Sequence, residues 1–172
     1  MDTALKTVGN LLPYHLLSYG ALLGTELFQS FVNTKICFQA LPMREFIGLQ
    51  KRIFPVYFGC QVGLAALTAA TRPPYSVLSL GQDAWGTTSL VVVLVTGTLN
   101  WFVFGPRTTT ASFVRRALHE NQDKSDDPDG RVNRANRNFA RNHAMAIHLN
   151  AISLVATIFY GFSFASSLLE GL

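Results

Sequence analysis

Four long apolar segments constrain the fold of this chain more than any other feature of its sequence. Each approaches or exceeds the roughly 20 residues that a helix needs to cross about 30 Å of hydrocarbon. Only 14% of the 172 residues are charged, whereas a soluble domain carries about 25%. The pattern predicts an all-α polytopic membrane protein, a single four-helix transmembrane bundle over residues 1–172. The predicted spans are residues 11–34, 53–71, 86–105 and 144–169.

The segments between the spans have patterns of their own. Residues 41–52 mix apolar with basic side chains, which predicts a short interfacial helix, and Pro55 then falls in the first turn of the second span. Gly105-Pro106 is expected to end the third span. Residues 121–130 are rich in turn formers and predict a mobile loop. After it, residues 131–142 are expected to form a basic helix that runs directly into the fourth span.

Basic residues are distributed unequally between the two sides of the membrane. With four spans, the side with both termini carries only Lys6 and Arg72 of the 14 Lys and Arg residues. The positive-inside rule therefore predicts lumenal or extracellular termini and cytoplasmic long loops, and it explains the net charge of +4 without nucleic-acid binding. For the basic residues 131–141, a solvated juxtamembrane helix is the alternative to lipid contact. Contact with anionic lipid headgroups is expected at Arg44, Lys51, Arg52, Arg134, Arg137 and Arg141.

Polar side chains inside the spans gather in one leaflet. Glu26 in the first span costs on the order of 2.5–3.5 kcal/mol to insert into a membrane. In the predicted topology it lies in the cytoplasmic half, with polar residues from the other three spans, whereas the lumenal halves are nearly apolar apart from hydroxyl groups and His15. We expect a cytoplasm-facing polar pocket, in which Arg107 pairs with Glu26 or with an anionic ligand. Its residues are Glu26, Gln29, Asn33, Tyr57, Gln61, Asn100, Arg107, His143 and His148.

The same residues have a second interpretation as an interhelical hydrogen-bond network that fixes the register of the bundle. Two further features also concern packing. Gly20-x-x-x-Gly24 and Gly59-x-x-x-Gly63 are small-residue faces that permit close helix approach, either within the bundle or between two copies. Cys37 and Cys60 are interpreted as small apolar residues and not as a disulfide.

The sequence contains no recognisable catalytic or metal-binding set. The predicted spans hold a single acid, so no carboxylate dyad forms, and no nucleophile–base pair has a familiar spacing. His143 and His148 are five residues apart, about 140° around a helix, so they cannot chelate one metal ion. His15 lies near the opposite face, which argues against a shared haem. We expect no metal, no cofactor and no enzyme, with a membrane enzyme that uses Glu26 and His148 as a remote alternative.

Three ordered motifs carry a resemblance to a known family. They are LPMREFIGLQKRIFPVYF at 41–58, NWFVFGPRTTTA at 100–111 and NFARNHAMAIHLN at 138–150, supported by FQSFVN at 28–33. Together they resemble the transmembrane protein 205 family of small four-span eukaryotic proteins. The resemblance implies a place in the endomembrane system, with the endoplasmic reticulum preferred and the plasma membrane as the alternative. It also implies a link to platinum-drug resistance.

Two functional hypotheses follow. The first is a non-enzymatic membrane protein that acts as an accessory or assembly subunit, with other membrane proteins or a second copy as partners. The second is a small transporter, channel or lipid-handling protein that uses the pocket around Glu26. Since four short helices scarcely enclose a pore, the second hypothesis requires an oligomer.

Overall fold

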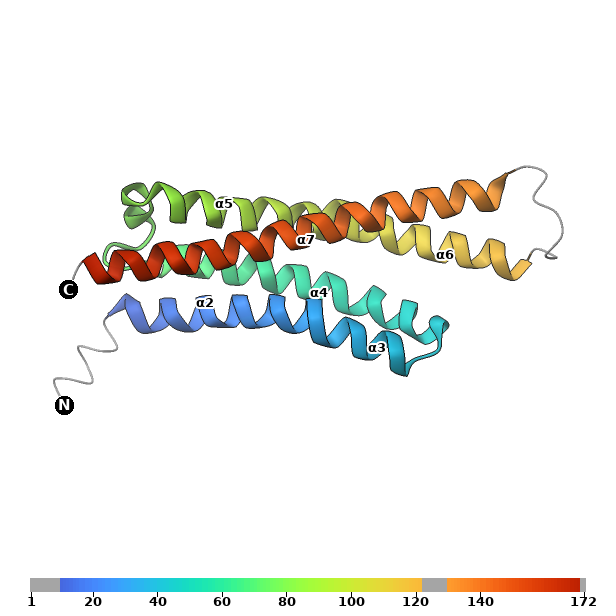
Figure 1. Cartoon of the computed structure of the whole chain (residues 1–172), viewed down its shortest axis with the longest axis horizontal. Coiled ribbons are helices and arrows are strands. Elements are labelled where there is room, and N and C mark those ends of the chain that lie inside the picture. Colours follow the sequence, from blue (N-terminus) through green and yellow to red (C-terminus); the bar gives the residue numbers. More distant parts are fainter. Residues whose placement is uncertain (1–9, 122–129, 171–172) are drawn as a thin grey trace.

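The computed structural model describes residues 10–121 and 130–170, and within these ranges every regular element is a helix (Figure 1). Residues 122–129 of the predicted mobile loop lie outside the described residues. The elements are α2 (Leu11–Leu27), the π-helical turn η1 (Phe28–Asn33), α3 (Thr34–Ala40), α4 (Met43–Ala70), the 3-10 helix η2 (Ser76–Gln82), α5 (Ala84–Leu99), the π-helical turn η3 (Asn100–Phe104), α6 (Gly105–Asn121) and α7 (Arg131–Glu170).

Three helices in the described part of the chain are long and apolar enough to cross a membrane. They are α4, the continuous helix from Ala84 to Glu120 that joins α5, η3 and α6, and α7. These three contain the second, third and fourth predicted spans, so the chain has the helices of a membrane protein. The remaining predicted span corresponds to α2, which has 17 residues and continues through η1 into α3.

The helices continue where the sequence predicted boundaries. Residues 43–70 form one helix, so the predicted interfacial helix is not separate and Pro55 lies inside α4 instead of in its first turn. Gly105-Pro106 does not end the third helix, because η3 changes the hydrogen-bond spacing just before the proline: the Gly105 N–H donates to the Asn100 carbonyl. A Cβ at Gly105 would collide with that carbonyl oxygen. The predicted run from residue 131 into the fourth span is confirmed by α7.

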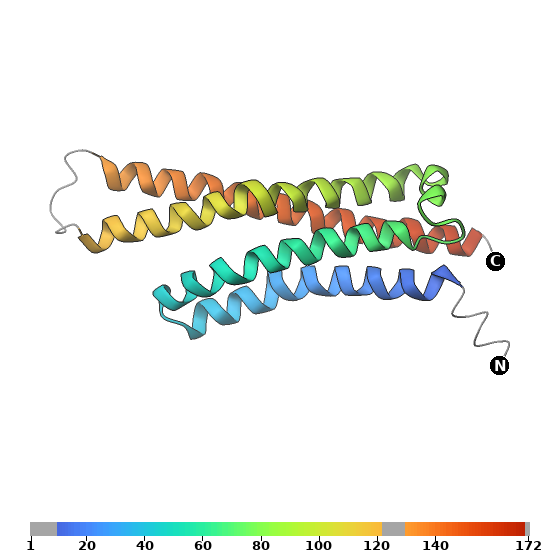
Figure 2. The same ribbon diagram turned by 180° about the vertical axis from the view of Figure 1, so that it is seen from behind.

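The long helices run roughly along one axis, and the two ends of the molecule differ (Figures 1 and 2). One end, here called the terminal end, holds the start of α2, the η2 connection and the end of α7. The other, the loop end, holds the turn between α3 and α4, and beyond that turn α6 and the first part of α7 extend side by side. Pairs of neighbours along the bundle are α2 with α4 and α5 with α7, while α4 also packs on α5.

A small apolar core joins these helices. One cluster contains Leu22 of α2, Ala65 of α4, Val93 of α5 and Ala156 of α7, each buried. The two alanines allow the helices to approach closely, as small residues do in membrane proteins. Many large apolar side chains instead point outward, for example Leu17 with 73% of its surface exposed. An apolar exterior around a small core suits a protein whose solvent is lipid.

Candidate functional site

A buried carboxyl group lies at the centre of the first polar cluster. Glu26 of α2, Gln61 of α4 and Ser153 of α7 are all fully buried. The Gln61 Nε2 donates to Glu26 Oε1 at 2.6 Å, and the Ser153 hydroxyl donates to the same oxygen at 2.9 Å. Gln61 Nε2 also lies 3.0 Å from Ser153 Oγ. Together with Thr157, one turn further along α7, these residues are called the Glu26 cluster.

The Glu26 cluster leaves several polar atoms without partners. Glu26 Oε2, Gln61 Oε1 and Thr157 Oγ1 are buried, and none of them has a hydrogen-bond partner among the residues that the structure describes. The Thr157 hydroxyl nevertheless faces the Glu26 carboxyl group. Among the described residues, no ion pair reaches Glu26. A buried charge without an opposite charge costs several kcal/mol on the order-of-magnitude scale for protein interiors. A charged Glu26 side chain would therefore be destabilising at this site.

A second layer of bonds lies toward the loop end. The Tyr57 hydroxyl donates to Asn150 Oδ1 at 2.7 Å, and Asn150 Nδ2 donates to Ser30 Oγ at 2.8 Å. Asn100 Nδ2 donates to the Ala146 carbonyl at 3.1 Å, while its Oδ1 stays buried without a partner. These bonds also join different helices.

Gln29 and Asn33 bond locally, within the helical turn that includes η1. Asn33 Nδ2 donates to Gln29 Oε1 at 2.7 Å, and Gln29 Nε2 donates to Thr34 Oγ1 at 3.2 Å. Within the described part of the chain, neither residue is hydrogen-bonded to Glu26. Of the predicted pocket residues, the structure therefore bonds Gln61 to Glu26 and gives Tyr57, Asn100, Gln29 and Asn33 other partners.

Three predicted pocket residues point away from Glu26. Arg107, His143 and His148 are exposed. The His148 Nδ1 lies 2.6 Å from the Ala144 carbonyl of its own helix, and the His143 ring stacks on Phe139. In the part of the chain that the structure describes, none of the three is bonded to Glu26. Arg107 is thus not its basic partner, and the acid–base pair of Glu26 with His148 is not formed.

The second polar cluster lies at the terminal end. Arg72 is buried, and its Nη2 forms an ion pair with Asp83 Oδ2 at 2.7 Å. Its Nη1 donates to the Tyr160 hydroxyl at 3.2 Å, and that hydroxyl lies 2.9 Å from His15 Nε2. The Ser163 hydroxyl donates to Asp83 Oδ2 at 2.8 Å. These five residues, called the Arg72 cluster, connect α2, α7 and both ends of the connection between α4 and α5.

The prediction for the lumenal halves excepted hydroxyl groups and His15. The Arg72 cluster joins His15 and the hydroxyls of Tyr160 and Ser163 to Arg72 and Asp83, which lie between the predicted second and third spans. Sequence reasoning did not find this cluster. The available signal was a pair of opposite charges at the two ends of one connection, Arg72 and Asp83. Burial raises the pKa of Asp83, but bonds from the Gly86 N–H and the Ser163 hydroxyl and the nearby Arg72 charge outweigh it, so the pKa is lowered overall.

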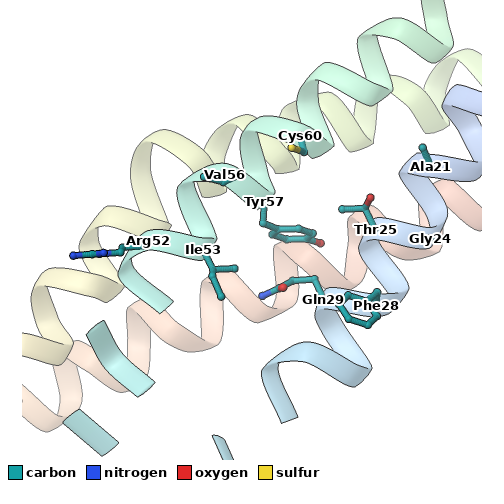
Figure 3. A pocket seen from close by; sticks show the side chains of 10 residues that line it. All are labelled: Ala21, Gly24, Thr25, Phe28, Gln29, Arg52, Ile53, Val56, Tyr57 and Cys60. Carbon is teal, nitrogen blue, oxygen red and sulfur yellow. The ribbon is translucent and has the colours of Figure 1, made fainter. Parts of the chain in front are cut away.

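An open groove of about 670 Å³ runs between α2 and α4 (Figure 3). Residues from 21 to 29 form one wall and residues from 52 to 60 form the other. A smaller pocket of about 270 Å³ lies between α4 and the η3–α6 segment, with Lys51 and Asn100 in its lining. The six predicted headgroup-contact residues are all exposed.

The predicted packing glycines divide into two groups. A Cβ at Gly59 would lie 3.1 Å from the Trp101 ring, so this glycine allows a close approach. A Cβ at Gly20, Gly24 or Gly63 would meet no atom within 4 Å. Gly97, which the sequence did not single out, packs closely instead, because a Cβ there would lie 3.0 Å from Gln61 Oε1. Cys37 and Cys60 are both free, as predicted.

Comparisons with known proteins found a family model and a relative that match this chain. The family model for a domain of unknown function, DUF4149, matches residues 17–117. The chain is 60% identical over 172 residues, the full length of both proteins, to "Xanthocillin biosynthesis cluster protein D" of Aspergillus fumigatus. No solved structure matches it. The resemblance to the transmembrane protein 205 family is therefore wrong, since neither match supports that family, and the implied link to drug resistance has no support.

Proposed function

This chain belongs to the DUF4149 family, and we propose that it is a four-span, single-domain membrane protein that acts as a non-enzymatic accessory or assembly subunit of a biosynthetic system. The observation that carries the proposal is the full-length, 60% identity to a protein named for a biosynthesis cluster. Three helices suited to membrane crossing support the membrane part. The accessory part rests on the relative's name and on the polar contacts of Glu26, which join helices.

The four-span topology adds α2 and η1 to the three long helices. Leu22 of α2 shares its core with residues of α4, α5 and α7, which supports a bundle of four. Large apolar side chains are exposed along α2 and η1, for example Leu17 and Phe31. An even number of spans places the start of α2 and the end of α7 on one side, as their common position at the terminal end suggests (Figure 1).

The orientation follows from the basic residues. Exposed cations such as Arg44, Arg52 and Arg137 lie on the parts of α4 and α7 near the loop end, whereas Arg72 at the terminal end is buried and paired. By the positive-inside rule, we place the loop end in the cytoplasm and both termini in the lumen or outside. The preference for the endoplasmic reticulum over the plasma membrane rested on the family resemblance and loses its support with it.

The accessory role can be tested by complementation and cross-linking. In an Aspergillus fumigatus strain that lacks cluster protein D, expression of this chain should restore the wild-type level of the product of that biosynthesis cluster. Cross-linking in intact membranes should connect it to enzymes encoded in the same cluster. A chain that restores nothing and is recovered from mild detergent as a lone monomer would contradict the proposal.

A second candidate function is favoured by one specific observation, the uncompensated Glu26 carboxyl group with its free Oε2. Such a group suits a transporter, channel or lipid-handling protein, which would need an oligomer to enclose a path. Glu26→Gln should then change flux or ligand binding in reconstituted vesicles. Unchanged flux from a normally folded Glu26→Gln protein excludes this function, whereas complementation by the same variant supports the accessory role.

A further inference from the structure

The groove between α2 and α4 is separate from both polar clusters, since no residue of either cluster lines it. Gly24, Thr25 and Phe28 form part of one wall, while Arg52, Val56 and Cys60 form part of the other (Figure 3). Because these segments lie in two proposed spans, the groove faces the lipid. We propose that it binds one acyl chain of an anionic phospholipid, whose phosphate contacts Arg52. This inference does not depend on the accessory role.

The lining favours a narrow apolar occupant. Apart from Arg52, the polar side chains in the lining are the small Thr25, Gln29 and Tyr57. The two larger ones already have partners inside the protein: Gln29 bonds to Asn33 and Thr34, and Tyr57 bonds to Asn150. Their hydrogen-bonding capacity is largely used, so a ligand rich in polar groups would bury them unpaired at a cost. The wall from residue 21 to 29 is about 12 Å long at 1.5 Å per residue. An acyl chain fits this chemistry and can lie along a wall of this length.

The anionic headgroup follows from Arg52. This side chain is exposed, lies at the loop end of the groove, and forms no ion pair with any acid among residues 10–121 and 130–170. A guanidinium group binds phosphate through two parallel hydrogen bonds, which an ammonium group cannot reproduce. Near the membrane surface each basic residue attracts anionic lipid by about 1 kcal/mol. Apolar walls that end at one unpaired arginine thus match a lipid with a charged end.

Shape argues against a second copy of the chain as the occupant. A two-fold interface brings the same patch of both subunits together. Here that patch is concave, because the groove of about 670 Å³ runs between the two helices. Two facing hollows would leave a void, and two Arg52 side chains would approach each other. A lipid chain fills a hollow without these costs.

The test uses Cys60, a free, exposed thiol in the groove wall, with the half-buried Cys37 outside it as the internal reference. The full-length protein is reconstituted in phosphatidylcholine vesicles with or without phosphatidic acid, and the alkylation of each cysteine by a membrane-permeable maleimide is followed by mass spectrometry. Phosphatidic acid should slow alkylation of Cys60 several-fold relative to Cys37. An equal rate in both vesicles would mean ordinary annular lipid and would overturn the inference.

Matched variants identify the site. Gly24→Leu fills the groove without a backbone clash, and Gly20→Leu, one turn earlier and outside the lining, is its control. Arg52→Gln removes the proposed phosphate contact, while Lys51→Gln removes a neighbouring cation that lies over the Phe113 ring. Gly24→Leu and Arg52→Gln should abolish the effect of phosphatidic acid, and both controls should retain it.

Two other results would overturn the inference. Loss of the effect in Gly20→Leu as well as Gly24→Leu, together with loss of a cross-linked dimer, would identify the face as a contact between copies. Equal losses in Lys51→Gln and Arg52→Gln would mean that general surface charge, and not Arg52, attracts the lipid.

Discussion

The Glu26 cluster and the Arg72 cluster each hold an acid between helices, buried at Glu26 and half-buried at Asp83. Asp83 pairs with an opposite charge, whereas Glu26 accepts hydrogen bonds from neutral groups. Asp83 lies 2.7 Å from the Arg72 guanidinium and accepts further bonds from Ser163 and the Gly86 N–H. Within residues 10–121 and 130–170, Glu26 accepts bonds from the Gln61 amide and the Ser153 hydroxyl, and its second carboxyl oxygen has no partner there. Asp83 thus has a partner of opposite charge, and among the described residues Glu26 has none.

The difference indicates what each cluster does. A buried ion pair is strongly destabilising when one partner is removed, because the other charge stays buried alone. The Arg72 cluster therefore holds the terminal end together, where η2 connects α4 to α5. Among the described residues no ion pair involves Glu26, so we expect its carboxyl charge to be dispensable for folding. The two clusters should respond differently to the same change of acid to amide.

The largest expected effect is at Asp83. Asp83→Asn leaves the Arg72 guanidinium buried without an opposite charge, so we expect a loss of about 3–5 kcal/mol in the free energy of unfolding. Reversible unfolding in mixed micelles measures it. The control is Glu120→Gln, which breaks the more exposed Arg116–Glu120 pair and should cost no more than about 0.5 kcal/mol. Similar losses in the two variants would mean that the Arg72 cluster does not depend on its ion pair.

The two substitutions at Glu26 should separate charge from hydrogen bonding. Glu26→Ala leaves Gln61 and Ser153 without their shared acceptor, so it should cost about 1–3 kcal/mol. Glu26→Gln keeps an acceptor oxygen and supplies an N–H that can reach the Thr157 hydroxyl, so it should be at least as stable as the native protein. Both are measured by the same unfolding experiment. If Glu26→Gln were as damaging as Glu26→Ala, the carboxyl charge itself would be needed for stability.

Glycine substitutions compare the packing around the clusters. A Cβ at Gly86 would run into Asp83 Oδ2 and lie 2.9 Å from Arg72 Nη1, so it would disturb the ion pair. A Cβ at Gly97 would meet the Gln61 amide and Val62 at 3.0 and 3.1 Å, where small adjustments suffice. Gly86→Ala should therefore cost about 1–3 kcal/mol, and Gly97→Ala about 1 kcal/mol or less. Gly20→Ala is the control without contacts, and thermal unfolding ranks the three; the reverse order of Gly86 and Gly97 would contradict the comparison.

The smallest expected effect is a dependence on pH. The pKa of Asp83 is lower in the folded protein than its ordinary value of 3.8. The unfolded state therefore takes up a proton first as the pH falls, so the stabilisation by Asp83 is present above the unfolded pKa and lost as the pH drops through the folded one. Thermal unfolding in the Glu26→Gln background should show a loss of stability below about pH 4. Adding Asp83→Asn should remove that loss, and an unchanged profile would exclude Asp83 as its source.

Much of the architecture was predictable because it follows from local pattern. Long apolar segments predicted the three helices from Met43, Ala84 and Arg131, and the helical phase of residues 131–142 predicted their continuation into the fourth span. The depth of Glu26 and Gln61 in their spans predicted the same leaflet, and the structure places them in contact. Depth follows directly from residue number, since each helical residue rises about 1.5 Å.

Other features could not be predicted in this way. Pro106 was expected to end a helix, but the π-helical spacing at Asn100 lets the helix continue past it. Arg107 and His148 have suitable depth for a pocket with Glu26, yet they point outward. The contact between His15 and Tyr160 joins residues 145 positions apart. Depth places such side chains at one level, but it does not say which way they face.

The sequence by itself determined that this chain is helical, that its helices are apolar enough for a membrane, and where along each helix the polar residues lie. These properties depend on composition and on the 3.6-residue period of the helix. The tertiary structure alone decided which acid obtained a charged partner. Rotation and register between packed helices bring Arg72 to Asp83 and leave Glu26 with an amide and a hydroxyl. No local pattern specifies these two quantities, because they result from the fit of side chains across all helices at once.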